Sequence, residues 1–420
     1  MSLLSRMSAP SATHDVARLV ATLLSHQSGA APLVPGARAA RGDASRRAAS
    51  ASAGAPRPRH AVPTGPTGLG TSGLRIPATR PAAGTTAGTA TGASGTSGAS
   101  GTPVPELYCP PPLRDDRALG DEVNDRLIAW AEEIGIYPER LDGIRSTNLG
   151  RMTMLVHPQT DDPDRLLAAA RCALAEWATD DYYCDDETMG SSPAHLGAHL
   201  GTALAAVDSA HLPEPHASEL DEALRADPVR AALRSGFEHL ARYADPSQLA
   251  RVRQEIGGLF VGYGQEGSWR STGKMPAVWE YLTHRRFNSF LPCIALVDVM
   301  DGHPLSAAEY AEPRVRRAVT MAGTASTLVN DLYSMAKEKD ATGLNFNLPA
   351  AIVAEEKCTL REAVERSAAI HDELVRSFER EAAALSLTGS PALRRFLAGV
   401  WAWLGGNKAW HAGTARYGTP

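Results

Sequence analysis

The sequence predicts an all-α domain that follows a disordered segment. Apolar residues recur at helical spacing through nearly all of the chain after residue 105, and the alternating patterns typical of strands are almost absent. Residues 1–105 consist largely of Ala, Gly, Ser, Thr and Pro, which bury too little apolar surface to offset the entropy of the chain. We therefore expect disorder over 1–105 and a single helical domain over 106–420, with helices around a central space.

Charge separates the same two parts. Ten arginines and two acids give residues 1–105 a net charge of about +8, and the remainder carries about −13. The arginines are scattered without aromatic residues that could stack on bases, so we expect no nucleic-acid partner. No stretch approaches the roughly 18 apolar residues of a membrane helix. Five widely spaced cysteines favour neither a disulfide framework nor a zinc site. We expect a cytoplasmic protein with no membrane partner.

The elements of the domain follow in order. Leu107 to Pro112 ends in three prolines and should be extended. Apolar stripes then predict helices. The predicted helices span 123–134, 166–177, 196–207, 237–243, 249–263, 278–290, 315–337, 360–384 and 391–411. Breaks are expected at Asp245-Pro246 and at the Pro-rich or Gly-Pro stretches 211–215 and 301–304.

An acidic run follows the second of these helices. Residues 180–187 read Asp-Asp-Tyr-Tyr-Cys-Asp-Asp-Glu, with five carboxylates in eight positions. On a helix, Asp181 and Asp185 share a face with Asp180 beside them, and like charges at that spacing cost roughly 0.2–0.5 kcal/mol per pair. Carboxylates without a histidine cluster suit a hard cation such as Mg²⁺. The alternative is a solvated acidic end of a helix.

A second polar motif lies in the predicted helix 315–337 and just beyond it. Asn330, Ser334 and Glu338 are spaced four apart, so their oxygens form a shallow arc on one helix face and can reach one cation. Lys337, beside Glu338, could neutralise a phosphate. The alternative is a polar stripe on an exposed helix, but the apolar residues before the motif predict that this face points inward.

Together the two motifs resemble those of the class I terpene cyclases. Asp180-Asp181-x-x-x-Asp185 is similar to the family's aspartate-rich motif. Asn330-x-x-x-Ser334-x-x-x-Glu338, with Lys337 before the glutamate, is similar to its Asn/Ser/Glu triad. The resemblance spans about residues 106–417. It implies a class I terpenoid synthase-type domain with a central cavity, and three Mg²⁺ ions that bind a diphosphate between the two motifs. Which of the first three aspartates contact metal stays open.

The family pattern implies further diphosphate contacts. Arg285 matches the arginine that senses the diphosphate, with Arg286 as the alternative, and Asn288 and Ser289 fall at the helix break that follows it. Arg416 and Tyr417 match a pair that closes over the diphosphate. Aromatic rings stabilise cations by about 0.5–2 kcal/mol each. The candidates for that role are Phe287, Phe290, Trp403, Trp410 and Tyr417, with ordinary core packing as the alternative for each.

Within the family, the chain is most similar to the actinobacterial 2-methylisoborneol synthases. The similarity lies in the Tyr-Tyr-Cys of the acidic run, Asn330 to Ser334 with Lys337-Glu338, the stretch 285–293, and the long N-terminal segment. It implies cyclisation of an allylic diphosphate, 2-methylgeranyl diphosphate, with water capture to 2-methylisoborneol. It also implies a geranyl diphosphate C-methyltransferase as pathway partner and allows a homodimer.

Other functions stay open at this point. The same cation could lose a proton to give 2-methylenebornane, or the substrate could be geranyl or farnesyl diphosphate. A prenyl transferase usually carries two aspartate-rich motifs, whereas the second motif here is Asn/Ser/Glu. A non-catalytic helical binding protein with an accidental acidic patch is the remaining alternative.

Overall fold

The computed structural model of the chain describes residues 103–185, 191–335 and 346–414. Within these ranges the secondary structure is helical, without strands. The described residues all belong to one compact unit. Most of the segment predicted to be disordered, 1–102, lies outside them, as do Asp186, Glu187, Lys337, Glu338 and the pair Arg416-Tyr417.

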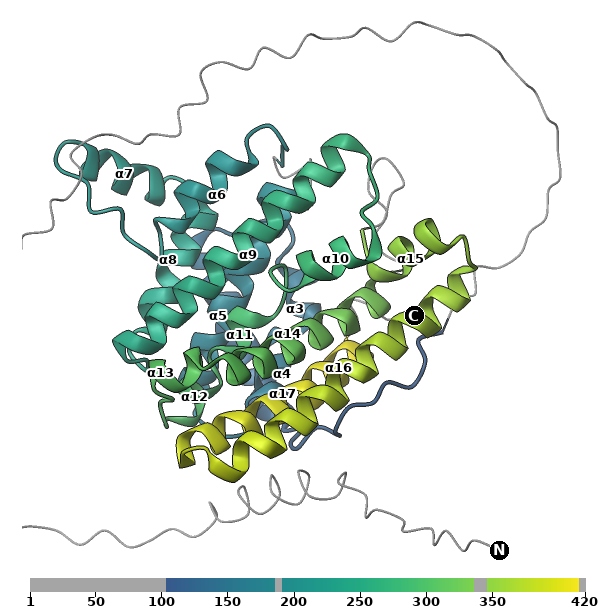
Figure 1. Cartoon of the computed structure of the whole chain (residues 1–420). Helices are drawn as coiled ribbons and strands as arrows, with labels where there is room; N and C mark the ends of the chain where they lie inside the picture. Colours follow the sequence, from purple (N-terminus) through teal and green to yellow (C-terminus); the bar gives the residue numbers. More distant parts are fainter. Residues whose placement is uncertain (1–102, 186–190, 336–345, 415–420) are drawn as a thin grey trace, which may run out of the picture. The chain divides into compact units, whose positions relative to one another are not determined.

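The elements follow one another with short connections (Figure 1). Their bounds are α2 Arg117–Ile134, α3 Leu141–Thr147, α4 Leu149–Val156, α5 Pro163–Asp180, η1 Asp181–Asp185, α6 Leu196–Leu204, α7 His216–Arg225, α8 Pro228–Leu240, α9 Pro246–Thr272, α10 Val278–Arg285, α11 Leu291–Ile294, α12 Val297–Asp301, α13 Ala307–Ala311, α14 Pro313–Ser334, α15 Leu348–Glu356, α16 Leu360–Thr388 and α17 Pro391–Gly413.

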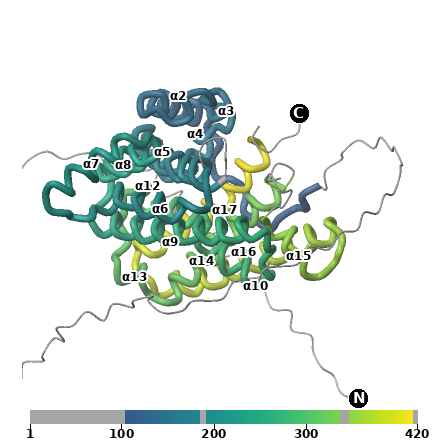
Figure 2. The backbone as a smooth tube through the Cα atoms, turned by 90° about the horizontal axis from the view of Figure 1, so that it is seen from above, coloured from purple at the N-terminus to yellow at the C-terminus, as the bar shows by residue number. Residues whose placement is uncertain are grey.

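Two helices that carry the predicted motifs lie in the centre of the packing. The helix α14 packs against α16 and α17, which run beside it in Figure 1. The helix α5 packs against α8 on one side and against α2 and α4 on another, and Figure 2 shows α2, α3 and α4 grouped together beside α5. One apolar cluster joins residues from α2, α4, α5, α9, α14 and α17. The helices α5 and α14, which carry Asp180 and Asn330 with Ser334, are therefore part of the packed core.

Acidic or polar residues followed by proline begin several long helices. Asp162, Asp227 and Asp245 each accept backbone N–H groups of the first turn of α5, α8 and α9, and a proline occupies the next position. Proline fits there because the first N–H groups of a helix have no partner inside the helix. Ser390 begins α17 in the same way. These Asp-Pro and Ser-Pro pairs explain why the helix starts are readable from the sequence.

The predicted helices are confirmed in outline, with one correction. The helix predicted over 278–290 ends at Arg285, and residues 286–290 form a break before α11. Several helices were not predicted, among them α4 and α7. The helix α4 has only eight residues, which are too few for apolar positions to recur over several turns. The extended start around Leu107 to Pro112 is confirmed.

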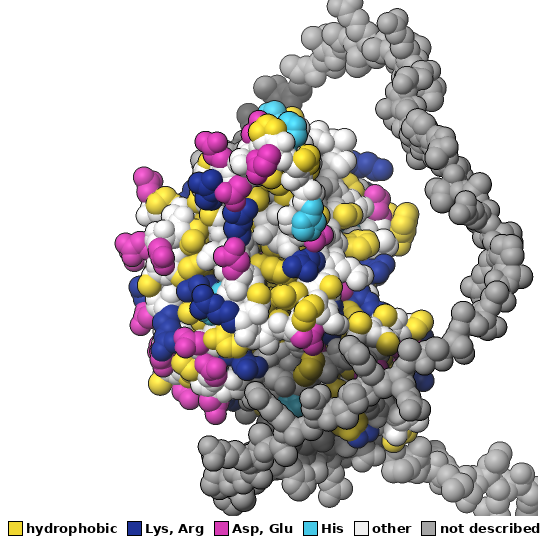
Figure 3. Space-filling view, turned by 90° about the vertical axis from the view of Figure 1, so that its left-hand side faces the viewer, with side chains coloured by type: hydrophobic (Ala, Val, Ile, Leu, Met, Phe, Trp, Pro, Cys, Tyr) yellow, Lys and Arg dark blue, Asp and Glu magenta, His cyan; other side chains and the backbone are white. Residues whose placement is uncertain are grey.

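The surface of α7 and α8 carries mixed charge. Figure 3 shows acidic and basic side chains interspersed with apolar ones on this side of the molecule. Asp221 on α7 forms ion pairs with Arg225 at 2.9 Å and Arg234 at 2.6 Å. Exposed pairs of this kind contribute little to stability. Among the described helices, none is long and apolar enough to cross a membrane.

Candidate active site

The acidic motif spans the end of a helix. The helix α5 ends at Asp180, and Asp181–Asp185 form a π-type turn, in which backbone hydrogen bonds connect residues five apart. The motif is therefore not the plain α-helical turn that the spacing predicts. Asp180 and Asp181 are both half-buried. Short π-type turns inside or beside α-helices occur frequently at functional sites.

Tyrosines fix this turn in place. The Tyr182 hydroxyl accepts the backbone N–H of Tyr137 at 2.8 Å, and the Tyr137 hydroxyl donates to Asp181 Oδ2 at 2.5 Å. The buried Tyr183 donates its hydroxyl to Asp227 Oδ2, at the start of α8, at 2.7 Å. The two tyrosines of the motif therefore have a structural role that the sequence does not reveal, because their partners lie in distant elements.

The second motif presents a buried hydroxyl. Ser334 is 2% exposed, and its Oγ has no hydrogen-bond partner among the described residues. Asn330 lies one turn earlier on the same face of α14, and its Oδ1 is 3.5 Å from Arg285 Nη2. A buried polar atom without a partner is costly and calls for an explanation. A hydroxyl and an amide oxygen on one helix face fit the oxygen ligands of a hard cation such as Mg²⁺.

Arg285 forms a buried ion pair with Asp331. Its Nε donates to Asp331 Oδ1 at 3.1 Å and its Nη2 donates to the same oxygen. Burial alone would lower the pKa of Arg285, but Asp331, Tyr281 and Glu266 together outweigh burial and raise that pKa. The guanidinium is thus held charged beside Asn330. Arg286, the alternative to Arg285, is exposed and lies over the Phe287 ring.

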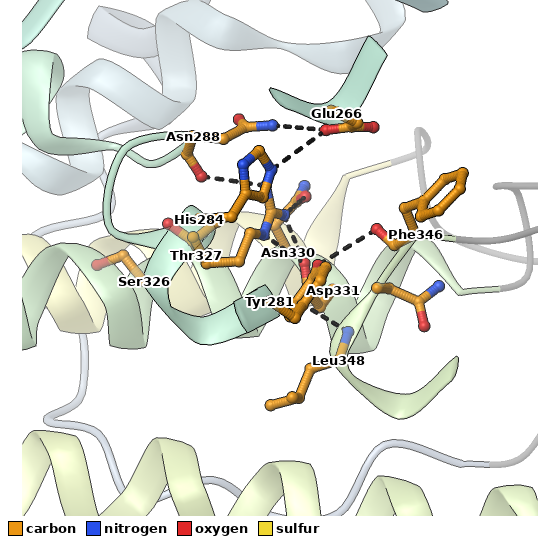
Figure 4. Close-up of polar contacts among 12 residues, drawn as sticks. Glu266, Tyr281, His284, Asn288, Ser326, Thr327, Asn330, Asp331, Phe346 and Leu348 are labelled. Atoms are coloured by element: carbon orange, nitrogen blue, oxygen red, sulfur yellow. Dashed lines mark hydrogen bonds and ion pairs between the residues drawn. The ribbon is translucent and has the colours of Figure 1, made fainter. Parts of the chain in front are cut away.

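Asp331 also fastens the chain beyond the second motif. Its Oδ2 accepts the Tyr281 hydroxyl at 2.8 Å and the backbone N–H of Leu348 at 3.0 Å. Tyr281 is on α10 and Leu348 begins α15, so one carboxylate joins α10, α14 and α15 (Figure 4). The sequence alone does not reveal this role of Asp331, because its partners come from two other elements, α10 and α15.

The aromatic candidates fall into two groups. Phe290 and Trp403 are buried with ring centroids 5.3 Å apart, and Trp403 Nε1 has no hydrogen-bond partner among the described residues. Trp410 is instead anchored, since its indole N–H donates to Thr147 O at 2.9 Å. Trp410 therefore acts in packing, whereas Phe290 and Trp403 stay candidates for contact with a cation. Tyr417 lies outside the described residues.

The described residues do not contain the complete predicted ligand set. Glu338 and the side chain of Asp185 fall outside them, together with Lys337 and Arg416. Among the described side chains, no three His, Cys, Asp or Glu groups come together in a way that could hold a metal ion. Such a grouping leaves out amides and hydroxyls, so Asn330 and Ser334 do not count toward it.

Comparison with known proteins identifies the family. A family model described as terpene synthase family 2, C-terminal metal binding, matches residues 172–377. The 2-methylisoborneol synthase of Streptomyces coelicolor is 40% identical over 360 residues, which cover 85% of this chain and 80% of that enzyme. The chain belongs to the terpene synthases. The 2-methylisoborneol synthase of Saccharopolyspora erythraea is 39% identical over 315 residues, covering 74% of this chain and 89% of that enzyme.

A solved terpene synthase has the same fold. The crystal structure of the Streptomyces coelicolor 2-methylisoborneol synthase in complex with Mg²⁺ and 2-fluoroneryl diphosphate gives a TM-score of 0.72 at 40% identity. The match covers 76% of this chain and 99% of that chain. The protein is therefore an enzyme of the class I terpene cyclase type. The region that the metal-binding family model matches contains both predicted motifs.

A buried acid in this terpene synthase was not predicted from the sequence. Glu176 lies one helical turn before Asp180 on α5, and the Cys293 thiol donates to its Oε2 at 3.7 Å. Burial raises the pKa of Glu176 to about 8. The sequence signal was an acid inside an apolar stripe, between Leu174 and Trp177.

The raised pKa of Glu176 predicts a specific pH dependence of stability. Between its unfolded pKa near 4.5 and its folded pKa near 8, the folded state binds more protons, so the free energy of unfolding falls as pH rises. This loss, on the order of 3–5 kcal/mol, should be absent in Glu176→Gln. Urea unfolding from pH 5 to pH 8 would show the two proteins diverging. Parallel curves would contradict a neutral, buried Glu176.

Proposed function

We propose that this terpene cyclase converts 2-methylgeranyl diphosphate and water to 2-methylisoborneol and diphosphate, with Mg²⁺ as cofactor. The observation that supports this substrate is the near-complete match to the Streptomyces coelicolor 2-methylisoborneol synthase, which covers 99% of that chain in the solved structure. The allylic diphosphate class is supported by the ligands in crystal structures of that enzyme, 2-fluoroneryl diphosphate and geranyl-S-thiolodiphosphate.

The metal site that we propose has two halves. Asp180, Asp181 and Asp185 form the first, and Asn330, Ser334 and Glu338 form the second. Mg²⁺ bound there supplies the positive charge that stabilises a departing diphosphate. The partnerless Oγ of Ser334 supports this assignment, because a metal ligand would satisfy it.

Fixed positive charge completes the diphosphate site. The ion pair with Asp331 holds Arg285 charged and immobile, which suits a group that stabilises developing negative charge without reorganisation. We propose Lys337, Arg416 and Tyr417 as further diphosphate contacts, from the family pattern. Lys337 lies in 336–345, and Arg416 and Tyr417 lie in 415–420, all outside the described residues.

The apolar part of the site then controls the cation. The proposed path runs through ionisation, recapture as the tertiary diphosphate, rotation, and two ring closures to a bornyl-type cation. Water adds to that cation and loses a proton, which gives the alcohol. Phe290 and Trp403 are suited to face the cation, since aromatic faces attract positive charge without reacting with it.

Incubation of the purified full-length protein with three substrates tests this proposal. With Mg²⁺, 2-methylgeranyl diphosphate should give mainly 2-methylisoborneol, while geranyl and farnesyl diphosphate should be turned over much more slowly. Removal of Mg²⁺ with EDTA should abolish all products. Gas chromatography of the volatiles identifies each product.

Other outcomes would select other functions. A predominance of 2-methylenebornane, or turnover of farnesyl diphosphate alone, would contradict the proposed product or substrate. Chain elongation on addition of isopentenyl diphosphate would indicate a prenyl transferase. If no substrate were turned over with or without Mg²⁺, the protein would be a non-catalytic binding protein.

The proposed substrate implies a supplier. An allylic diphosphate with an added methyl group must come from a C-methylation, so we propose a geranyl diphosphate C-methyltransferase as the preceding enzyme. We also propose a homodimer, on the basis of the family resemblance. Sedimentation of the full-length protein tests the dimer directly.

A further inference from the structure

A half-buried carboxylate on α9, Glu266, lies between the two halves of the proposed metal site. Burial alone would raise its pKa, but Arg270, His284 and Arg285 outweigh burial and hold the pKa well below the usual range. The half-buried side chain is therefore an anion. Neither predicted motif includes it, and the proposed chemistry gives it no role.

One side of Glu266 leads to the acidic motif. Its Oε1 accepts Arg270 Nη2 at 2.7 Å, and Arg270 Nη1 donates to the backbone carbonyl of Cys184 at 2.6 Å. Cys184 belongs to the π-type turn Asp181–Asp185. The position of that turn therefore depends on an arginine whose counter-charge is Glu266.

The other side of Glu266 leads to the second motif. Its Oε2 accepts Asn288 Nδ2 at 2.8 Å, in the break that follows α10 (Figure 4). The carbonyl of Asn288 accepts Arg285 Nη1 at 3.1 Å, and Arg285 Nη2 is 3.5 Å from Asn330 Oδ1. Three hydrogen bonds, through Asn288 and Arg285, thus connect Glu266 to an expected metal ligand.

The backbone is shaped for this connection. At Gly262, one turn before Glu266 on α9, an added Cβ would lie 2.7 Å from the backbone nitrogen of Asn288. Glycine therefore allows the break to approach α9 closely enough for the bond between Asn288 and Glu266. His284 Nε2 lies 3.5 Å from the same carboxylate and closes the group (Figure 4).

We propose that Glu266 is a positioning residue that couples the acidic motif to the Asn/Ser/Glu motif through Arg270 and Asn288. The proposal rests on the metal-dependent function above. When metal binding moves the acidic turn, the ion pair between Arg270 and Glu266 changes. The same carboxylate accepts a hydrogen bond from Asn288, in the break at 286–290 that orients Arg285. Binding at one half therefore favours the geometry that binds at the other, which is a coupling of sites through shared contacts.

A matched pair of substitutions separates coupling from simple stability. Glu266→Gln keeps the shape and removes the charge. Glu255→Gln makes the same change at a second glutamate of α9, which is buried, pairs with Arg316 at 2.6 Å and accepts the Tyr310 hydroxyl at 3.1 Å. Both variants should lower the melting temperature, because each removes the negative charge that an arginine pairs with.

Binding of inorganic diphosphate as a function of Mg²⁺ concentration, measured by calorimetry on the full-length protein, gives the deciding readout. Glu266→Gln should weaken binding about 10-fold and reduce its cooperativity with Mg²⁺, within the usual range of coupling. Glu255→Gln should bind as the wild type does. Equal binding by both variants would overturn the proposal.

A second variant covers the case in which Glu266→Gln does not fold. Asn288→Ala removes the amide that Glu266 accepts and leaves no charge unpaired, while the backbone carbonyl that Arg285 contacts remains. It should show the same loss of Mg²⁺ cooperativity, and wild-type cooperativity in this variant would overturn the coupling. If the wild-type protein itself bound no diphosphate with Mg²⁺, the proposed function would fail first, which is a different result.

Discussion

Ser334→Ala should abolish most of the cyclisation without destabilising the protein. In the fold, Ser334 Oγ is buried and has no hydrogen-bond partner among the described residues, so its removal costs no internal bond. Relief of an unpaired buried hydroxyl can even raise stability by about 1 kcal/mol. As a metal ligand, however, the same oxygen should be indispensable. We expect kcat/KM to fall more than about 100-fold, beyond the 10–100-fold typical of groups that only support a ligand.

Two measurements test this prediction: diphosphate release in the presence of Mg²⁺, and thermal unfolding in EDTA. Ser367→Ala on α16 is the matched control, since it is also a buried serine, and its Oγ donates to Ala363 O at 2.8 Å. The control should lose a little stability and keep its turnover. A Ser334→Ala protein with wild-type Mg²⁺ dependence would exclude Ser334 as a ligand.

The features of the fold that repeat along the chain were readable from the sequence. Asp245-Pro246 and Pro391 mark the starts of α9 and α17, and amphipathic stripes predict the bodies of most long helices. The starts of α5 and α8 were placed too late, at 166 and 237. The helix α4 was not predicted, because its eight residues are too few to show a recurring apolar stripe. The end of α10 at Arg285 was also misplaced, since the break depends on contacts with α9 at Gly262 that are remote in sequence.

The site divides in the same way. Asn330 and Ser334 could be proposed from spacing, because both lie on one helix and four residues always make one turn. Glu266 and Asp331 could not, because each owes its role to partners on other elements. The local signals were weak. Glu266 and Arg270 are four residues apart on α9, a spacing that is common in surface ion pairs. Asp331 directly follows Asn330, which was already assigned as a metal ligand.

Arg285→Met should both destabilise the protein and abolish turnover. Asp331 is 1% exposed, so loss of Arg285 leaves a buried carboxylate without its counter-charge, at a cost of about 3–5 kcal/mol. The proposed diphosphate contact would be lost as well. Urea unfolding measures the first effect, and calorimetric binding of diphosphate with Mg²⁺ to the folded protein measures the second.

A second substitution and a control separate these two effects. In Arg285→Met with Asp331→Asn, the buried charge is gone while the amide oxygen can still accept Tyr281 or Leu348, so much of the stability should return and turnover should not. Arg251→Met breaks the comparable buried pair with Asp298 between α9 and α12. It should cost a similar free energy of unfolding and leave diphosphate binding intact. Recovery of turnover in the double variant would mean that Arg285 acts only by neutralising Asp331, whereas stability without turnover assigns the guanidinium to the diphosphate itself.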